Sequence, residues 1–330
     1  MPNRTTPLTP ARPATAGSRP SRTGASRTGL PRAGILDGPA PILVAAVLWG
    51  TTGTVASLAP AGAPAAAIGC AGLALGGILM FLTSRGARSL PAACTRSERL
   101  LLFLGAVTVA GYPVTFYPAV ARTGVAVATV IALGSAPVFA GLLAWITGRA
   151  RPTARWTVAT AAAVVGCVLL VTGPQLAGHT GTMDLVGVAL AACGGLSYAV
   201  YALIGGTLIS RGHASDAVMG VLFGAAGLLV LPVVVVAGTG WTATVRGAAV
   251  AGYLALFTVF LAYRLFGYGL RRTPASTATS LTLGEPAVAA VLGVFLLGER
   301  LPAVSWCGLA VLALGMVLLA VPAGTGRRCR

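Results

Sequence analysis

The sequence predicts an all-α integral membrane protein with ten transmembrane helices, arranged as two inverted five-helix repeats with both termini in the cytoplasm. The first supporting observation is composition: 56% of the 330 residues are hydrophobic and only 9% are charged, whereas a soluble domain carries roughly a quarter charged residues. The second is the recurrence of apolar runs of about 18 or more residues, each able to cross roughly 30 Å of hydrocarbon. The third is an internal repeat at offsets of 148 to 150 residues.

The elements follow one another in a simple order. Residues 1–36 are rich in Arg, Pro, Ser and Thr and contain almost no large apolar side chain, which predicts a disordered tail without the apolar core of a signal peptide. Whether this tail touches anionic lipid or precedes the true start of translation stays open. Residues 37–172 form the first predicted repeat, residues 181–322 the second, and residues 323–330 a basic C-terminal tail. The ten expected spans are 40–58, 64–83, 100–119, 124–147, 155–172, 184–209, 215–237, 248–270, 274–297 and 302–321.

The distribution of arginine predicts the orientation. All 23 basic residues are arginine, and with the N-terminus inside, 19 of them fall in the tails and inner loops. Only Arg122, Arg246 and Arg300 fall in outer loops, and an excess of positive charge marks the cytoplasmic side. Nucleic acid is not an expected partner despite the net charge of +17, because no basic stripe is interleaved with aromatic residues. Membrane lipid is the expected surroundings of the apolar runs.

The repeat relates the two halves residue by residue. An offset of 149 residues pairs Pro137 with Pro286 and Gly166 with Gly315. Five spans per repeat is an odd number, so the two halves must enter the membrane from opposite sides. Inverted halves that exchange conformations give a simple route to alternating access.

Two GxxxG motifs are paired by an offset of 148 residues, namely Gly72/Gly76 and Gly220/Gly224. Glycines at this spacing permit close helix contact. We expect these contacts within the helix bundle of a monomer, with a homodimer face as the alternative.

Glu285 stands in the middle of the expected span 274–297 and is followed at once by Pro286. A carboxylate near the bilayer midplane is costly and marks function, and the proline frees a backbone carbonyl one turn earlier. Desolvation disfavours the charged form of a carboxylate, which makes Glu285 a candidate for proton coupling. It could instead bind a cationic group of the substrate, or only lock helices together.

Three other groups of charges admit more local explanations. A rise of 1.5 Å per residue puts Arg264 about 9 Å and Glu285 about 16 Å from the inner end of their spans. An ion pair between them is therefore within reach, and snorkelling of Arg264 to the cytoplasmic interface is the equal alternative. Asp184 is expected to cap the helix that it opens. The pair Glu299–Arg300 is expected to form a local contact at an outer turn.

Several short motifs resemble the EamA-type members of the drug/metabolite transporter superfamily. They are Trp49-Gly50, Ala262-Tyr263, Gly269-Leu270-Arg271-Arg272, Leu283-Gly284-Glu285-Pro286 and Leu297-Gly298-Glu299-Arg300. The resemblance covers about 290 residues, all but the tails, and implies ten spans in two five-helix repeats. One departure is Gly148-Arg149-Ala150-Arg151, where the first half lacks the acidic residue that matches Glu299.

The resemblance also implies that spans 1, 3, 4, 6 and 8 line a central cavity. Polar-tipped side chains lie inside these spans, and each has either a pocket role or a structural hydrogen bond. They are Trp49, Tyr112, Ser135, Tyr198, Tyr201 and Tyr263. Pro137 and Pro286 are each expected to loosen their helix near the midplane. Together with Glu285 and Arg264, these residues form the predicted substrate and ion pathway.

The sequence therefore predicts a secondary transporter of the inner (plasma) membrane that exports an amino acid-like solute or a toxic organic compound, coupled to protons. Members of the resembling family move such solutes, mostly outward. Uptake, or a carrier without ion coupling, is the alternative within the same fold. An enzyme or a channel is more distant, because neither HExxH nor GxSxG occurs and one carboxylate does not make a ring of charge.

No metal site, cofactor or disulfide framework is expected. The six cysteines show no CxxC spacing, and His179 and His213 are the only histidines.

Overall fold

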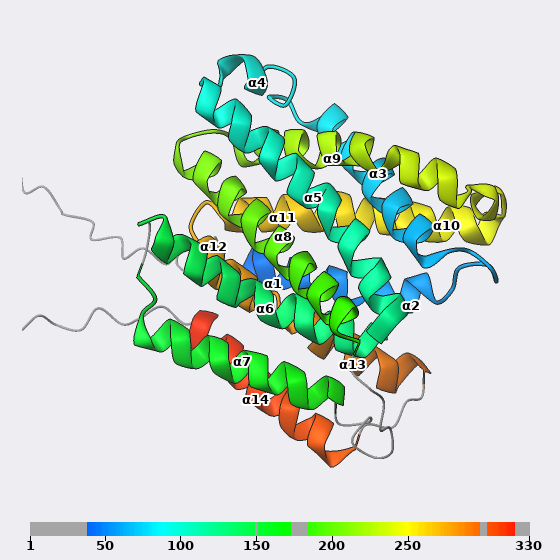
Figure 1. Ribbon diagram of the computed structural model, residues 1–330, viewed down its shortest axis with the longest axis vertical. Helices are drawn as coiled ribbons and strands as arrows, with labels where there is room; N and C mark the ends of the chain where they lie inside the picture. Colours follow the sequence, from blue (N-terminus) through cyan, green and yellow to red (C-terminus); the bar gives the residue numbers. More distant parts are fainter. Residues whose placement is uncertain (1–37, 124, 149–150, 173–183, 298–301, 321–330) are drawn as a thin grey trace, which may run out of the picture. The chain divides into compact units, whose positions relative to one another are not determined.

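The computed structural model describes residues 38–123, 125–148, 151–172, 184–297 and 302–320, and within these ranges every regular element is a helix (Figure 1). Helices occupy the described part of each expected span. Seven expected spans are single helices: α3 (Ala65–Thr83), α5 (Arg96–Thr123), α6 (Val125–Ile146), α7 (Ala154–Thr172), α8 (Leu185–Ser210), α9 (Ser215–Ala237) and α14 (Ala303–Ala320). Two short helices, α4 (Leu90–Ala93) and the 3₁₀ turn η2 (Gly240–Ala243), lie in connections.

Three expected spans are divided into consecutive helical segments. The first consists of α1 (Pro39–Gly50) and α2 (Thr52–Ala56), and the ninth of α12 (Ala275–Leu281) and α13 (Gly284–Leu297). The eighth runs through α10 (Val245–Tyr253), a π-helical stretch η3 (Leu254–Leu261) and α11 (Ala262–Gly269). Hydropathy indicates whether a segment is buried in lipid, and it does not indicate the backbone hydrogen-bond pattern. The apolar runs therefore did not predict these divisions.

Length and hydropathy qualify seven described segments to cross a membrane. They are Pro39–Ala56, Ala66–Thr83, Arg96–Val120, Ala128–Ile146, Leu185–Ser210, Ser215–Ala237 and Val245–Gly269. Two shorter apolar stretches, Ala154–Leu169 and Ala303–Leu318, lie in α7 and α14. The chain is therefore a multi-pass, all-helical membrane protein.

Helices at equivalent positions of the two predicted repeats pack against each other. The helix α3 lies along α9, and α7 lies along α14 (Figure 1). The other main contacts come in related pairs, since α5 packs on α8 in the way that the equivalent α11 packs on α1. This is the pattern expected if a two-fold axis relates the repeats.

Close approach of α7 and α14 depends on the glycines that the repeat pairs with each other. A Cβ atom on Gly166 would lie 2.4 Å from the backbone nitrogen of Leu312, and a Cβ on Gly315 would lie 2.7 Å from the Ala159 carbonyl oxygen. Because neither position has room for a side chain, the two backbones pack directly.

The GxxxG glycines also lie in contacts within the bundle. Gly76 packs on the π-helical stretch, where a Cβ would be 2.5 Å from the Ala255 carbonyl oxygen. Gly224 packs on α3, where a Cβ would be 2.5 Å from the Cβ of Phe81. The expectation of contacts within one chain is confirmed at these positions.

The two paired prolines behave differently from each other. Pro286 lies in the first turn of α13, just after the break at Thr282 and Leu283, where a proline is tolerated. Pro137 is enclosed in α6, which continues through it. The expectation that both prolines loosen their helices stays a prediction for α6, which is one continuous helix. Its flanking residues keep helical hydrogen bonding, and one missing N–H does not end a helix that neighbouring helices hold in place.

Candidate transport site around Glu285

Glu285 lies in the first turn of α13, at the break that divides the ninth span. Its backbone N–H donates to the Thr282 carbonyl at 3.0 Å, which closes the tight turn between α12 and α13. An acidic residue in the first turn of a helix lies at the positive end of the helix dipole. A helix interrupted at membrane depth is a structure that transporters use to bind solutes and ions.

The Glu285 carboxylate has no partner among the described residues. It forms neither an ion pair nor a side-chain hydrogen bond with any of them, and it keeps part of its surface accessible. On the side of α1, Gly50 allows close approach, since a Cβ there would be 2.9 Å from the Glu285 carbonyl oxygen. The backbone of Glu285 is thus packed closely against α1, while its carboxylate remains available to a ligand or a proton.

Five of the predicted aromatic residues form one cluster. The ring of Trp49 of α1 is tilted against that of Tyr263 of α11 with centroids 4.7 Å apart, and it packs edge-on with Tyr198 of α8 with centroids 6.3 Å apart. Tyr201 lies 5.2 Å from Tyr198 and 6.1 Å from Tyr263, and Tyr112 of α5 lies 6.5 Å from Tyr198. Four helices therefore converge on these rings.

The cluster is joined to the break beside Glu285. The Tyr198 hydroxyl donates to Thr282 Oγ1 at 2.9 Å. The Tyr201 hydroxyl is buried and near that of Tyr263, but makes no hydrogen bond of standard geometry with the described residues.

Accessibility differs among these residues. Trp49, Tyr198 and Tyr201 are buried, whereas Tyr112, Tyr263 and Glu285 each keep some accessible surface. The three buried rings pack against one another, and the three accessible side chains are the ones that could touch a solute.

Ser135 and Pro137 lie outside the aromatic cluster. The Ser135 hydroxyl donates to the Ala132 carbonyl at 3.2 Å, and its side chain fits against α8, where a Cβ on Gly195 would collide with it at 2.2 Å. Pro137 is buried in α6. Both residues therefore have structural explanations in helix packing.

Arg264 does not reach Glu285. Its guanidinium donates to Ser84 Oγ at 3.2 Å and to Thr83 Oγ1 at 3.4 Å, both at the C-terminal end of α3. It also lies over the Phe260 ring at 4.8 Å. A cation at a helix C-terminus is favourable. The C-terminal end of α3, and not Glu285, is therefore the partner of the Arg264 guanidinium. Both residues are described, and no ion pair joins them.

Asp184 has the capping role expected of it. Its carboxylate accepts a hydrogen bond from the Gly187 N–H at 3.0 Å, and it pairs with Arg122 at 3.1 Å. The Gly187 hydrogen bond, and then the Arg122 partner, lower the pKa of Asp184 below its ordinary value. The pair Glu299–Arg300 lies outside the described residues.

Three participants in this site were not predicted from the sequence. Phe266 contacts Trp49 at 5.6 Å, Thr282 receives the Tyr198 hydroxyl, and the Thr258 carbonyl accepts the Trp49 indole N–H at 2.8 Å. Phe266 follows Tyr263 by one helical turn and could have been found by that spacing. The other two depend on the break before Pro286, which the proline only hints at, and on the π-helix, for which the sequence carries no signal.

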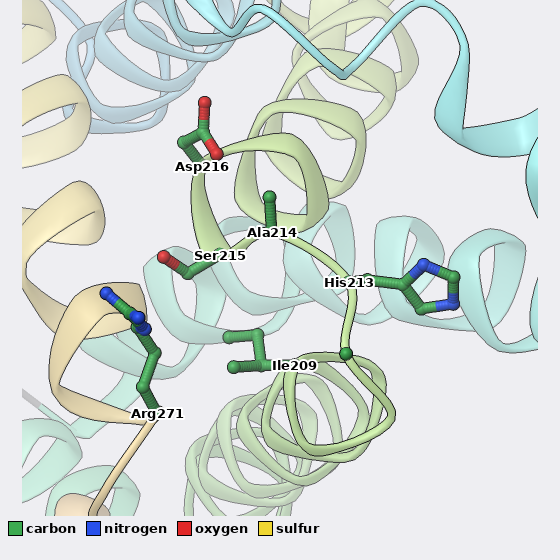
Figure 2. A pocket seen from close by; sticks show the side chains of 7 residues that line it. Ile209, His213, Ala214, Ser215, Asp216 and Arg271 are labelled. Carbon is green, nitrogen blue, oxygen red and sulfur yellow. The ribbon is translucent and has the colours of Figure 1, made fainter.

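A cavity of about 390 Å³ lies elsewhere, at the turn between α8 and α9. It is lined by Ile209, Gly212, His213, Ala214, Ser215, Asp216 and Arg271. Figure 2 shows the His213 ring directed away from the side on which Ser215, Asp216 and Arg271 lie. None of the predicted pathway residues lines this cavity.

Comparison with known proteins assigns the family. The model of the EamA-like transporter family matches twice, over residues 38–172 and 185–321. The uncharacterized transporter YwfM of Bacillus subtilis (strain 168) is 39% identical over 278 residues, which span 84% of this chain and 92% of that protein. The uncharacterized inner membrane transporter YedA of Escherichia coli (strain K12) is 28% identical over 57% of this chain and 60% of that protein.

A solved crystal structure shares the fold. It superposes with a TM-score of 0.68 at 18% identity, over 84% of this chain and 94% of that chain. The two matches of the family model fall on the two repeats, and the expected family is confirmed. This chain belongs to the EamA-like transporter family, within the drug/metabolite transporter superfamily.

Proposed function

We propose that this transporter exports a small organic solute across the inner membrane by alternating access, with Glu285 as the group that couples transport to protons. The observation that carries the proposal is the unpartnered Glu285 carboxylate at an interrupted helix, beside a cluster of aromatic rings. A carboxylate at membrane depth is costly, and its lack of a partner among the described residues leaves a proton or a cationic group to compensate its charge.

The proposed topology has ten spans, inverted repeats and both termini in the cytoplasm. Helices in all ten expected ranges support it, as does the pairing of α3 with α9 and α7 with α14. The arginine distribution supports the orientation, because inner segments hold most of the 23 arginines. The inner membrane location draws on the same composition and on the similarity to YedA.

Exchange of a solute for a proton follows if the Glu285 carboxylate binds both of them in turn. When Glu285 is ionised, it can attract a cationic part of a solute, and when it is protonated, that attraction is lost. Solute and proton then compete for one position, so each leaves as the other arrives. Tyr112 and Tyr263, which keep accessible surface, would present hydroxyls and ring faces to the same solute.

The proposed cargo is therefore compact, organic and partly apolar, such as an amino acid-like metabolite or a toxic organic compound. The aromatic cluster, through the accessible rings of Tyr112 and Tyr263, offers apolar area with few polar groups to fix orientation.

The solute content of the medium tests this function. Cells that overproduce the native chain are compared with cells that produce Glu285→Gln, which keeps the shape of the side chain and removes its charge. Asp184→Asn is the matched control, because it also removes a carboxylate but keeps a capping group. We expect one or more metabolites to accumulate outside cells with the native chain and the control, and to fall to background with Glu285→Gln.

The alternative outcomes separate the parts of the proposal. Equal accumulation with Glu285→Gln would contradict the coupling role and keep the exporter. No difference from cells without the protein, once the protein is detected in the membrane, would contradict export and favour uptake.

A further inference from the structure

Three metal-ligating side chains from two distant segments meet at one end of the helix bundle. His213 Nε2 lies 3.9 Å from Cys94 Sγ and 3.4 Å from Glu98 Oε1. The ligand atoms of all three residues lie within 4.8 Å of one another. A sulfur, a nitrogen and an oxygen therefore face a common centre.

The first segment is the turn between α4 and α5. Cys94 ends α4, and Thr95 and Glu98 form a capping box at the start of α5. Glu98 Oε2 accepts hydrogen bonds from the Thr95 N–H at 3.0 Å and the Thr95 hydroxyl at 2.9 Å. These bonds fix the carboxylate and leave Oε1 directed at His213.

The second segment is the turn that ends α8. Gly212 adopts a left-handed conformation with φ of 98°. The His213 N–H donates to the Leu208 carbonyl and the Gly212 N–H to that of Ile209, which is a Schellman motif. This termination reverses the chain and directs the His213 ring toward the α4–α5 turn. Figure 2 shows the ring on the side away from Arg271.

The donor set matches Zn²⁺ in chemistry, and the two distances from His213 match it in spacing. Thiolate, imidazole and carboxylate are its three usual protein ligands, at about 2.0–2.3 Å, so ligand atoms of one tetrahedral site lie roughly 3.3–3.8 Å apart. The two distances from His213 Nε2, 3.9 and 3.4 Å, are close to this spacing. Mg²⁺ and Ca²⁺ prefer all-oxygen ligands and suit the triad poorly.

The surroundings permit an ion to enter. Cys94 is buried, and the side chains of His213 and Glu98 are 20% and 12% exposed. Arg211 shares Glu98 Oε1 at 3.3 Å, but its side chain is 44% exposed and can turn into water when a cation arrives. The three ligands leave a fourth position for a water molecule.

We propose that Cys94, Glu98 and His213 form a binding site for a zinc-class divalent ion, which ties the α4–α5 turn to the α8–α9 turn. The first segment belongs to the first repeat and the second segment to the second. The site stands apart from the proposed transport of a solute, because none of its ligands belongs to the cluster around Glu285. Cys94 and His213 are separated by 119 residues in sequence, so no local spacing motif could reveal the whole set.

Metal titration of the full-length protein in detergent tests the site. The protein carries an affinity tag without histidine, is stripped of metal with a chelator, and is dialysed against micromolar Zn²⁺. We expect about one Zn²⁺ per chain. Loss of an outer-shell partner weakens a metal site by roughly 10–100-fold, so Cys94→Ser and His213→Gln should each weaken binding by at least that factor.

Matched variants separate this site from background binding. Cys193→Ser and Cys307→Ser remove exposed cysteines elsewhere, and His179→Gln removes the second of the two histidines. These three variants should bind Zn²⁺ as the native chain does. If Cys94→Ser or His213→Gln fails to fold, Co²⁺ bound to the native protein gives the answer, because a thiolate ligand produces a charge-transfer band in the near ultraviolet.

Three outcomes would overturn the proposal. The native chain could fail to take up Zn²⁺ at micromolar concentrations, folded Cys94→Ser and His213→Gln variants could bind it as well as the native chain, or the Co²⁺ complex could show no thiolate band.

Discussion

Trp49 connects the aromatic cluster to the irregular part of the eighth span. Its indole N–H donates at 2.8 Å to the carbonyl of Thr258, inside the π-helical stretch η3, and its ring lies against Tyr263. A π-helix changes the usual hydrogen-bond register and is often found at functional sites. The tryptophan therefore satisfies a buried carbonyl and holds a cluster ring in place with the same side chain.

Substitution of Trp49 should show how much the hydrogen bond from Trp49 to Thr258 contributes to the free energy of unfolding. Trp49→Phe keeps an aromatic ring but leaves the Thr258 carbonyl without its donor and removes part of the buried volume. We expect a loss of about 1–3 kcal/mol in the free energy of unfolding, measured by thermal or denaturant unfolding in detergent.

Trp306→Phe is the matched control, because Trp306 lies at the start of α14 and is 48% exposed. It should change stability by less than about 0.5 kcal/mol. Equal losses in the two variants would show that the indole contact with η3 contributes nothing of its own.

The aromatic residues were predictable from the sequence, and their partners were not. Polar-tipped rings in apolar spans stand out, and the resemblance to the family places their helices around one cavity. Arg264 illustrates the limit, since its partner Ser84 lies 180 residues away. No pattern near Arg264 distinguishes Ser84 from Glu285, so two alternatives remained until the helices were placed.

At the scale of elements, backbone contact between α7 and α14 depends on single glycines. Gly166→Ala would place a Cβ 2.4 Å from the backbone nitrogen of Leu312, and a backbone atom cannot move aside as a flexible side chain can. We expect this variant to lose about 1–3 kcal/mol of stability as the two helices are forced apart.

Gly134→Ala in α6 is the control for the substitution itself. The nearest atom to its Cβ would be Val164 Cγ1 at 3.6 Å, an ordinary contact. Alanine is the better helix former by up to about 1 kcal/mol, so this variant should be neutral or more stable in the same unfolding assay. If Gly166→Ala behaved like Gly134→Ala, α7 and α14 would not pack as closely as described.

The positions of the helices were largely predictable, because long apolar runs bounded by arginine, proline and glycine are typical of membrane spans. The breaks were not. The run 274–297 contains no charged residue before Glu285 and reads as one span, and the hydrogen bonds of Leu283 to Ser280 and of Glu285 to Thr282 reveal the turn. Pro137 and Pro286 occupy matching places, yet only Pro286 follows a break.

At the scale of the whole molecule, orientation can be tested with the natural cysteine in the C-terminal tail. With both termini in the cytoplasm, a membrane-impermeant thiol reagent should label Cys329 only in permeabilised cells. Ala61→Cys, in the exposed turn before α3, should be labelled in intact cells because it lies on the outer side in the proposed topology. Labelling of Cys329 in intact cells, with Ala61→Cys protected, would reverse the orientation.

The arrangement of helix pairs has a consequence for how the molecule could change state. The pairs α3–α9 and α7–α14 join equivalent helices, so their geometry can be kept when the two repeats exchange conformations. The contacts α5–α8 and α1–α11 are related to each other, and α5–α8 is the more extensive. An exchange would make α1–α11 the larger contact. We therefore expect the pairs α3–α9 and α7–α14 to keep their geometry during transport. The difference in extent between α5–α8 and α1–α11 would then indicate on which side of the membrane the transporter is closed.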